Sequence, residues 1–431
     1  MNGLLTLWKF NDLLNLSYRI DSVSIVFLIA IIVLWISSGI YSVFYMKEKE
    51  NKKRYYAFYM ALFVVMVLMA LSANLFTFYM NYELMTLLSA PLVMHEQTKE
   101  ARMAGIKYLL YSLLGAYCVL FGFYVFSKYA ISYEFTLGGN LNNSLVAGNE
   151  GIVLAAVFVM IVGFGVKAGT WPLHSWLTTA HPIAVSPASA VLSGVIVKSG
   201  VVGTIRVVYY IAGPDFIKGT WVQTAWMIIT LLTVFLGSTL AFFEPVLKKR
   251  LAYSTISQVS YILFGLSVLG DTAYKGAMLQ FTAHAFSKCA LFLIAGLFII
   301  ITGSVKVDDM KGIGKKYPLL LWAYTVCALS MIGIPPTGGF LAKWYLIEGS
   351  LEKGLGRFSW FGPLVLLISA LLTAGYLLPL SMKGFLPGAD YKEDNTEKIK
   401  IPGVCTIPIL VLTVLCVLVG IIPNIFTGGG F

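Results

Sequence analysis

Long apolar stretches, separated by short polar segments, recur along almost the whole chain. Roughly twelve of them have the length of a membrane-crossing helix, about 20 residues at about 1.5 Å rise per residue. Strands of a membrane barrel would alternate apolar and polar residues, whereas Phe63 to Leu71 is apolar at every position. The pattern therefore predicts helices near 23–45, 55–73, 75–95, 102–126, 151–176, 183–211, 221–243, 250–270, 275–302, 318–349, 360–386 and 404–424.

Composition agrees with this pattern. Of the 431 residues, 58% are hydrophobic and only 12% are charged, and the mean hydropathy is +0.82. A water-soluble domain of this composition would expose a large apolar surface. We therefore expect an all-α, polytopic membrane helix bundle that forms a single membrane domain over 1–431.

The basic residues are divided unevenly between the two sets of loops. With the amino terminus outside, 19 of the 31 Lys and Arg residues fall on the cytoplasmic side and 7 on the outer side. The positive-inside rule favours this orientation in a cell membrane, so the net charge of +11 implies no nucleic-acid partner. Arg206, near the outer end of its helix, is expected to snorkel to the interface. The charged opening segment does not resemble a signal peptide, so the span from Val23 is expected to direct insertion.

The sequence offers no ligand pattern for a cofactor. The chain contains no GxxxxGK(S/T) segment and no strand-bounded GxGxxG, which argues against ATP hydrolysis and dinucleotide chemistry. We therefore expect no cofactor, no metal and no redox centre in this chain, and an energy source in a partner or an ion gradient. Its cysteines are scattered, form no CxxC pair and lie mostly in apolar spans: Cys118, Cys289, Cys327, Cys405 and Cys416.

Five ionisable residues lie inside otherwise apolar spans: Glu83, Lys167, Lys198, Lys288 and Lys343. Charged side chains are costly in hydrocarbon, so residues of this kind usually mark a proton or ion pathway. One acid against four lysines would give a net charge of about +3 if all were ionised, which hydrocarbon disfavours. Some of the lysines must therefore be neutral part of the time.

Two spans contain helix-breaking residues. In GFGVKAGTWPLHSW, Pro172 lacks an N–H and clashes with the carbonyl four residues earlier, so the helix should break just after Lys167. In GIPPTGGFLAKWYL, the Pro and Gly cluster should break a second helix, which reopens before Lys343. An offset of 176 residues relates Lys167 to Lys343 and brings Lys107 to within one residue of His284.

The two interrupted spans are five helices apart. Because five is an odd number, the units that contain them must cross the membrane in opposite directions. We therefore expect two inverted five-helix repeats, 55–211 and 221–386, followed by a cytoplasmic loop and a last helix in 387–431. Transporters with inverted repeats hold their broken helices at a site near the midplane.

Several ordered motifs resemble one protein family, the antiporter-like membrane subunits of respiratory complex I. The resemblance is carried, in order, by VKAGTWPLHSWLTTAHPIAVSPASAVLSGVIVKSGVVGTIR, LKKRLAYSTISQVSYI, FTAHAFSKCALFLIAG and GIPPTGGFLAKWYL. Related subunits occur in Mrp-type sodium/proton antiporters and in membrane-bound hydrogenases. The stretch LSYRIDSVSIVFL resembles the family's third helix, so the first two helices, and a long lateral carboxy-terminal helix, are expected to be missing.

The resemblance implies a role for each central residue. Glu83, in FYMNYELMTLL, resembles the acid that pairs with the lysine of the first broken helix, Lys167. Lys198, in GVIVKSG, resembles the central relay lysine, and Lys343 resembles the exit lysine of the second broken helix. A relay toward the second half is implied for the two residues of AHAFSKCALF, His284 and Lys288.

The five charged residues also have purely structural interpretations. Glu83 could be satisfied by neighbouring hydroxyls. Lys167 and Lys343 could cap the broken half-helices, with Lys167, at a carbonyl end, as the better case. Lys198 and Lys288 could snorkel from tilted helices.

The four histidines are weaker candidates. His284 could be a packing residue, His174 and His181 are expected to shape the loop or water access beside Pro172, and His95 is interpreted as interfacial. Only His284 lies near the middle of a span, which argues against a diheme cytochrome, because that class needs paired axial ligands.

The leading hypothesis is a proton-translocating subunit of a redox-driven complex, such as a membrane-bound hydrogenase or a complex I-like oxidoreductase. Its expected partners are the lipid bilayer, other membrane and peripheral subunits, and protons, with sodium as an alternative ion. A proton freed when Glu83 and Lys167 separate would pass along Lys198, His284 and Lys288 to Lys343. The alternative is a D-type subunit of an Mrp antiporter; a purely structural scaffold is disfavoured by the five central ionisable residues.

Overall fold

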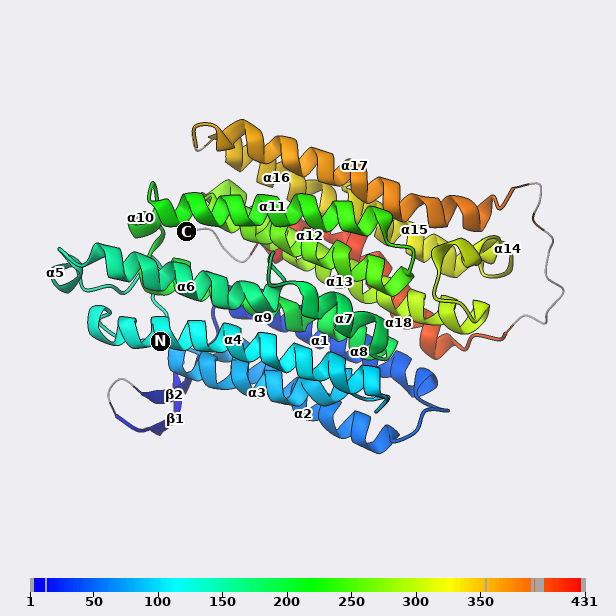
Figure 1. Ribbon diagram of the computed structural model, residues 1–431, viewed down its shortest axis with the longest axis horizontal. Helices are drawn as coiled ribbons and strands as arrows, with labels where there is room; N and C mark the ends of the chain where they lie inside the picture. The colour runs from blue at the N-terminus through cyan, green and yellow to red at the C-terminus, as the bar shows by residue number, and fades with distance from the viewer. Residues whose placement is uncertain (1–3, 12–13, 353–354, 389–390, 392–398, 428–431) are drawn as a thin grey trace.

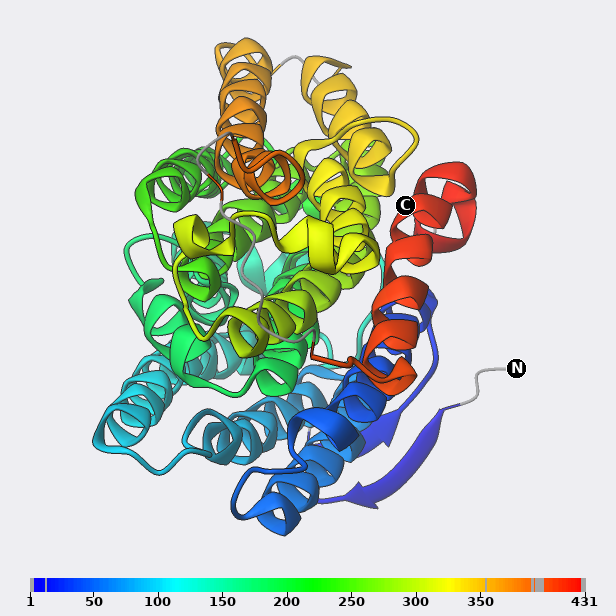
Figure 2. The ribbon, with the colours of Figure 1, turned by 90° about the vertical axis from the view of Figure 1, so that its right-hand side faces the viewer.

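Helices that lie nearly parallel along one axis make up most of the chain (Figure 1), and the view along that axis shows them packed side by side (Figure 2). This computed structural model describes residues 4–11, 14–352, 355–388, 391 and 399–427. The predicted all-α membrane bundle is confirmed. Three lysines counted in the orientation argument lie outside the described residues: Lys353, Lys392 and Lys398.

The first half of the chain, up to residue 217, contains a strand pair and the helices that surround the first break. Its elements are β1 (Leu5–Lys9), β2 (Asn15–Tyr18), α1 (Ser22–Tyr45), α2 (Lys52–Leu71), α3 (Leu75–Val93), α4 (Lys99–Tyr129), α5 (Asn143–Val146), α6 (Glu150–Ala168), α7 (Ser175–Ile183), α8 (Ser186–Val191), the π-helical turn η1 (Leu192–Ile196), α9 (Val197–Ile205), the π-helical turn η2 (Arg206–Ala212) and α10 (Pro214–Ile217).

The second half contains the helices around the second break and the last helix. Its elements are α11 (Trp221–Phe243), α12 (Leu247–Ser267), α13 (Asp271–Thr302), the 3-10 turn η3 (Val307–Met310), α14 (Ile313–Lys316), α15 (Pro318–Ile332), α16 (Gly338–Glu352), α17 (Phe358–Phe385), α18 (Gly403–Ile421) and the 3-10 turn η4 (Pro423–Phe426).

Within the described ranges, nine helical runs are long and apolar enough to cross a membrane. The other three predicted spans correspond to α3, α12 and the α15–α16 pair. Helix α12 carries a polar run, STISQVS, that is buried inside the bundle, so it does not need an apolar lipid-facing surface. Helices α15 and α16 have only 15 residues each because the span is broken between them.

Both predicted breaks are present. Helix α6 ends at Ala168 and is followed by Gly169 with φ +80°, and α15 ends at Ile332 and is followed by Gly333 with φ +97°. A residue in this left-handed region ends a helix, and glycine adopts it without a Cβ clash, so these glycines terminate the helices. In Figure 1, α6–α7 runs from left to right and α15–α16 from right to left, the antiparallel relation that inverted repeats require.

Two elements form the centre of the bundle. Helix α13 packs against α1, α8, α12, α15, α16 and α18, and it is buried from Gly276 to Phe298. The continuous run from α8 through η2 is buried throughout. These two elements carry Lys198, His284 and Lys288, so the fold places three of the predicted site residues in its core.

The strand pair at the amino terminus was not predicted. Strands β1 and β2 form an antiparallel hairpin, and Tyr18 bridges to Ser72 in the connection between α2 and α3. Figure 1 shows the hairpin beside the ends of α2 and α3. The two strands are short, and their pairing shifts register between Thr6 and Trp8. Such a short hairpin is hard to recognise in a sequence dominated by longer apolar runs.

Candidate functional site

Lys167 lies in the last turn of α6 and is fully buried. Its ammonium group donates hydrogen bonds to Thr86 Oγ1 at 2.9 Å, Tyr108 OH at 3.0 Å and Ser112 Oγ at 2.8 Å. It also lies 4.5 Å from the centroid of the Tyr108 ring. Because an ammonium group has three N–H donors, the hydroxyls from α3 and α4 satisfy all of them.

Glu83 lies on α3, three residues before Thr86, and is half-buried. Among the described residues, its Oε1 atom has no hydrogen-bond partner and it forms no ion pair with Lys167. The contact expected from the resemblance is therefore not made in this conformation, because the hydroxyls occupy the lysine's donors. Residues three apart on a helix share a face, so Glu83 and Thr86 present alternative acceptors on the same side of α3.

Lys198 and His284 meet although they lie on α9 and α13. Lys198 Nζ lies 2.7 Å from His284 Nδ1, and it also donates to the Ser193 carbonyl at 3.0 Å. Both side chains are buried, and no described atom hydrogen-bonds to His284 Nε2. Ser193 belongs to η1, and π-helical turns of this kind are frequent at functional sites. The structure thus brings together two residues that the resemblance assigned to successive steps.

A further set of hydrogen bonds connects this pair to Lys288. Ser193 Oγ lies 2.8 Å from Thr255 Oγ1, and Thr255 donates to the Leu251 carbonyl at 2.9 Å. Lys288 Nζ donates to the same carbonyl at 3.1 Å. Because a carbonyl oxygen accepts a hydrogen bond but carries no proton to pass on, this link orients Lys198 and Lys288 rather than conducts between them.

Lys343 lies in the second turn of α16 and binds the end of the preceding helix. Its Nζ atom donates to the carbonyl oxygens of Met331 and Ile332, each at 2.6 Å. These are among the last carbonyls of α15, which the break leaves without helical partners. Its ammonium also lies 5.1 Å from the centroid of the Tyr261 ring.

The expectation that Lys167 is the better candidate for capping a broken helix is wrong. Lys343 follows its break and can reach back to α15, whereas Lys167 precedes its break and turns to hydroxyls instead. At the end of α6, the carbonyl of Val166 accepts hydrogen bonds from Trp176 Nε1 at 2.8 Å and from the Gly169 N–H at 3.2 Å.

A polar cluster in the second half was not identified from the sequence. Gln280 Nε2, on α13, donates to Gln258 Oε1, on α12, at 2.8 Å, and Gln258 Nε2 donates to Thr373 Oγ1, on α17, at 3.4 Å. Tyr376 OH donates to Ser254 Oγ at 2.7 Å. The signal that could have identified it is the polar STISQVS run of α12 inside an apolar span.

The side chains of the remaining histidines take no part in the hydrogen bonds of the central lysines. His181, on α7, is fully buried, stacks on Phe292 with ring centroids 4.6 Å apart and has no hydrogen-bond partner for either ring nitrogen among the described atoms. His174 precedes α7, and His95, just after α3, is buried and forms a T-shaped ring contact with Tyr55. Their roles in shaping the loop or water access stay predictions.

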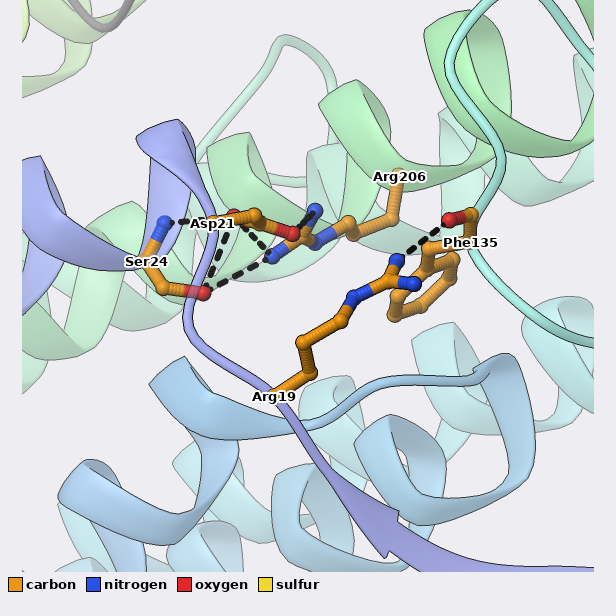
Figure 3. A network of polar contacts seen from close by, with 5 residues as sticks. All are labelled: Arg19, Asp21, Ser24, Phe135 and Arg206. Carbon is orange, nitrogen blue, oxygen red and sulfur yellow. Dashed lines mark hydrogen bonds and ion pairs between the residues drawn. The ribbon is translucent and has the colours of Figure 1, made fainter. Parts of the chain in front are cut away.

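The expectation that Arg206 snorkels is wrong. Its side chain is only 1% exposed and forms a bidentate contact with Asp21, at 2.6 Å and 3.0 Å (Figure 3). The guanidinium also lies within 5 Å of the ring centroids of Phe135 and Tyr210. The carboxylate that precedes α1 compensates the buried charge, so Arg206 does not need to reach the interface.

No group of three or more His, Cys, Asp or Glu residues suited to a metal ion occurs in the part of the chain that the structure describes. All five cysteines are free thiols. The candidate site consists of Glu83, His284, the hydroxyls around them and four buried lysines, which we call the lysine row: Lys167, Lys198, Lys288 and Lys343.

Comparison with family models gives two matches. The model described as NADH:quinone oxidoreductase/Mrp antiporter, TM, matches residues 72–373. The model described as NADH-Ubiquinone oxidoreductase (complex I), chain 5 N-terminus, matches residues 10–56. The first match covers well over half of the chain and includes every residue of the candidate site.

Individual relatives come from several complexes. The chain is 31% identical over 395 residues to NADH-quinone oxidoreductase subunit N of Desulforudis audaxviator, covering 87% of this chain and 75% of the relative. It is 30% identical over 430 residues to hydrogenase-4 component B of Escherichia coli, covering 94% of this chain but only 62% of the relative. It is 27% identical over 354 residues to a Na(+)/H(+) antiporter subunit of Bacillus subtilis, covering 80% of this chain and 69% of the relative.

Two solved structures share the fold. A chain of the Mrp complex from Dietzia sp. matches with a TM-score of 0.84 at 20% identity, covering 99% of this chain and 86% of the other. A chain of the archaeal membrane-bound sulfane sulfur reductase matches with a TM-score of 0.82 at 22% identity, covering 98% and 84%. At these identities the match shows the fold alone.

Proposed function

This chain belongs to the NADH:quinone oxidoreductase/Mrp antiporter transmembrane family, and we propose that it translocates protons as one subunit of a larger redox-driven membrane complex. Its proposed partners are other membrane and peripheral subunits of that complex. The redox reaction takes place in those partners, and this chain contributes the ion pathway. The relatives in quinone-linked and hydrogenase complexes support this assignment.

One observation carries the proposal: Lys198 and His284 share a 2.7 Å hydrogen bond in the buried centre of the bundle. Two buried groups that both bind protons cannot both be charged at low cost, since neighbouring positive charges repel in a poorly polarisable medium. Loading one group therefore disfavours loading the other. That coupling favours stepwise transfer of one proton over simultaneous storage of two.

The first step is assigned to Glu83 and Lys167. In the conformation described, Lys167 is held by three hydroxyls and is separated from the acid. A second conformation, in which Lys167 exchanges Thr86 for Glu83, would stabilise the charged lysine. We propose that alternation between these two arrangements loads and releases a proton, which then passes by way of Lys198 and His284.

Transfer then continues through the second half. Lys288 lies one turn beyond His284 on α13, and Lys343 binds the last carbonyls of α15. Those carbonyls carry the partial negative charge of a helix end and supply a counter-charge that no acid provides for Lys343 among the described ion pairs. Lys343 is the proposed exit.

The proposed location is the cell membrane, with the amino terminus outside. The excess of basic residues in alternate loops supports this orientation. We also propose that the chain contains two inverted five-helix repeats, 55–211 and 221–386, followed by a cytoplasmic loop and a last helix in 387–431.

Reconstitution of the purified complex into sealed vesicles tests the proposal. Driven by its own redox reaction in sodium-free buffer, the complex should move protons across the membrane, and a protonophore should abolish the signal. Transport that requires sodium, and that runs on an imposed proton gradient without redox turnover, would instead favour the alternative, an Mrp-type antiporter subunit. The Bacillus subtilis relative is named as a Na(+)/H(+) antiporter subunit.

A further inference from the structure

A groove of about 470 Å³ lies where α2, α3 and α4 end on the proposed cytoplasmic side. Arg54, two residues into α2, and Arg102, in the first turn of α4, line it together with Pro91, Met94 and Gln97. In Figure 1, these helix ends lie at the right-hand end of the bundle. Because these helices are expected to cross the membrane, we expect the groove to lie near the boundary between the hydrocarbon and the aqueous phase.

The two arginines have unused hydrogen-bonding capacity. Arg54 donates one side-chain hydrogen bond, from Nη2 to the His95 carbonyl at 2.7 Å, and the Arg102 guanidinium has no hydrogen bond or ion pair to any described residue. A guanidinium group offers five N–H donors in a fixed fork that matches a phosphate group. The nearby acid Glu96 is already paired with Lys49 at 2.9 Å, so it does not compensate the arginines.

Exposed apolar side chains lie one helical turn from the groove along α3 and α4. Leu87 lies one turn before Pro91 on α3, and Ile106 lies one turn after Arg102 on α4. All three apolar side chains in this region are exposed: Leu87 by 56%, Ile106 by 46% and Met103 by 59%. A ligand that places an anion between the arginines would therefore lay any apolar chain along an exposed hydrocarbon-level surface.

We propose that this groove binds one anionic phospholipid, with the phosphate held by Arg54 and Arg102 and the acyl chains lying along α3 and α4. A free anion would use the arginines but not the apolar surface, and an uncharged or zwitterionic lipid would leave the two positive charges without a net counter-charge. The proposed site is separate from the proton route and does not depend on it.

Lipid binding to the purified complex tests the proposal. The complex is stripped of lipid in detergent, mixed with equal amounts of phosphatidylglycerol and phosphatidylcholine, and its bound lipid is measured by native mass spectrometry. The Arg54→Gln/Arg102→Gln variant should bind one fewer phosphatidylglycerol, with about tenfold or greater loss of affinity at that site. The matched control is Lys52→Gln/Lys53→Gln, which removes two exposed charges from the same end of α2 and should retain the lipid.

Several outcomes would overturn the assignment. These are full retention of phosphatidylglycerol by the arginine variant, equal loss in the control, and displacement of the lipid by millimolar inorganic phosphate, which would indicate a free-anion site. A photoreactive benzophenone residue in place of Met103 should cross-link to lipid, and cross-linking to a neighbouring subunit would make the groove a protein contact. If the glutamine variant fails to assemble, Arg54→Lys/Arg102→Lys keeps both charges but removes the guanidinium forks. Weaker phosphatidylglycerol binding is then expected, and unchanged affinity would overturn the assignment of the phosphate to the two guanidinium groups.

Discussion

Lys198 and His284 are separated by 86 residues in the chain, yet Lys198 Nζ lies 2.7 Å from His284 Nδ1 at the centre of the bundle. The contact joins α9, which is buried throughout, to the buried part of α13 between Gly276 and Phe298. Each group can accept a proton and both cannot be charged at low cost, so we expect a proton on one to disfavour a proton on the other. The position of the pair between the two broken helices makes it the natural junction of the proposed route.

The hydroxyl groups of Ser193 and Thr255 should affect proton transport by orienting Lys198 and Lys288. Removing it with Ser193→Ala or Thr255→Val is expected to slow proton transport about fivefold, because a typical hydrogen bond contributes about 1 kcal/mol. The rate of proton uptake by reconstituted vesicles measures this effect. Thr282→Val is the matched control, since the buried Thr282 hydroxyl donates only to its own helix, at Met278, and its loss should leave the rate unchanged.

Glu83 and Lys167 should act as one unit. Glu83→Gln removes the negative charge that stabilises the ammonium in the second conformation, and Lys167→Ala removes the donor, so each should abolish most transport through this subunit. The double variant should be little worse than either single variant, the non-additivity expected of directly coupled residues. Transport rates of the four proteins in vesicles give the coupling; strictly additive losses would show two independent contributions.

Two variants of Lys343 should distinguish its role in capping α15 from its proposed role in carrying protons. Lys343→Ala removes two charge-assisted hydrogen bonds to α15 and should lower both transport and stability, the latter by about 1.5–3 kcal/mol. Lys343→Arg keeps a positive charge at the helix end but does not release a proton at physiological pH. Thermal unfolding should therefore be close to normal in the arginine variant while transport is lost, and normal transport by it would leave capping as the only function.

The contact between Asp21 and Arg206 should make stability depend on pH in the acid range. Burial of Asp21 opposes its ionisation, but the Arg206 guanidinium and the hydrogen bonds from Arg206 and Ser24 outweigh this effect and lower the pKa of Asp21. A lowered pKa in the folded state gives stability that is present above the ordinary value of about 3.9 and is lost as the pH falls through the lowered value.

Asp21→Asn tests this account of the amino-terminal end of α1. The variant should be about 3 kcal/mol less stable at neutral pH, because it leaves Arg206 buried without a counter-charge. The difference between the two proteins should shrink as the pH falls below the ordinary range of a carboxyl group. Unfolding temperatures of the wild type and of Asp21→Asn are compared from pH 6 to pH 3. A difference between them that stays constant over this range would contradict the pairing.

The positions of the helices and of both breaks could be predicted from the sequence, because hydrocarbon demands long apolar runs and because Pro and Gly disrupt helices locally. The π-helical turn before Lys198 could not be predicted, since it depends on packing between distant helices rather than on residues nearby in the chain. The buried, polar α12 was predicted as a span, but the Gln258 to Gln280 contact required knowledge of its neighbours.

Charged partners were the least predictable feature. Asp21 compensates Arg206 across 185 positions of the chain, so the sequence around Arg206 suggested snorkelling instead. Likewise, the three hydroxyls around Lys167 come from α3 and α4, and only the fold brings them to one point. In both cases the residue type indicated that a buried charge needed a partner, but not which partner.

The number of protons moved per redox turnover tests the central claim most directly. Vesicles containing the complex in sodium-free buffer are supplied with its electron donor, and proton uptake and redox turnover are recorded together for wild type and for Lys198→Met. The proposed route predicts that the variant keeps redox turnover but moves fewer protons per turnover, because Lys198 no longer exchanges a proton with His284. An unchanged ratio in Lys198→Met would contradict a proton route through this lysine row.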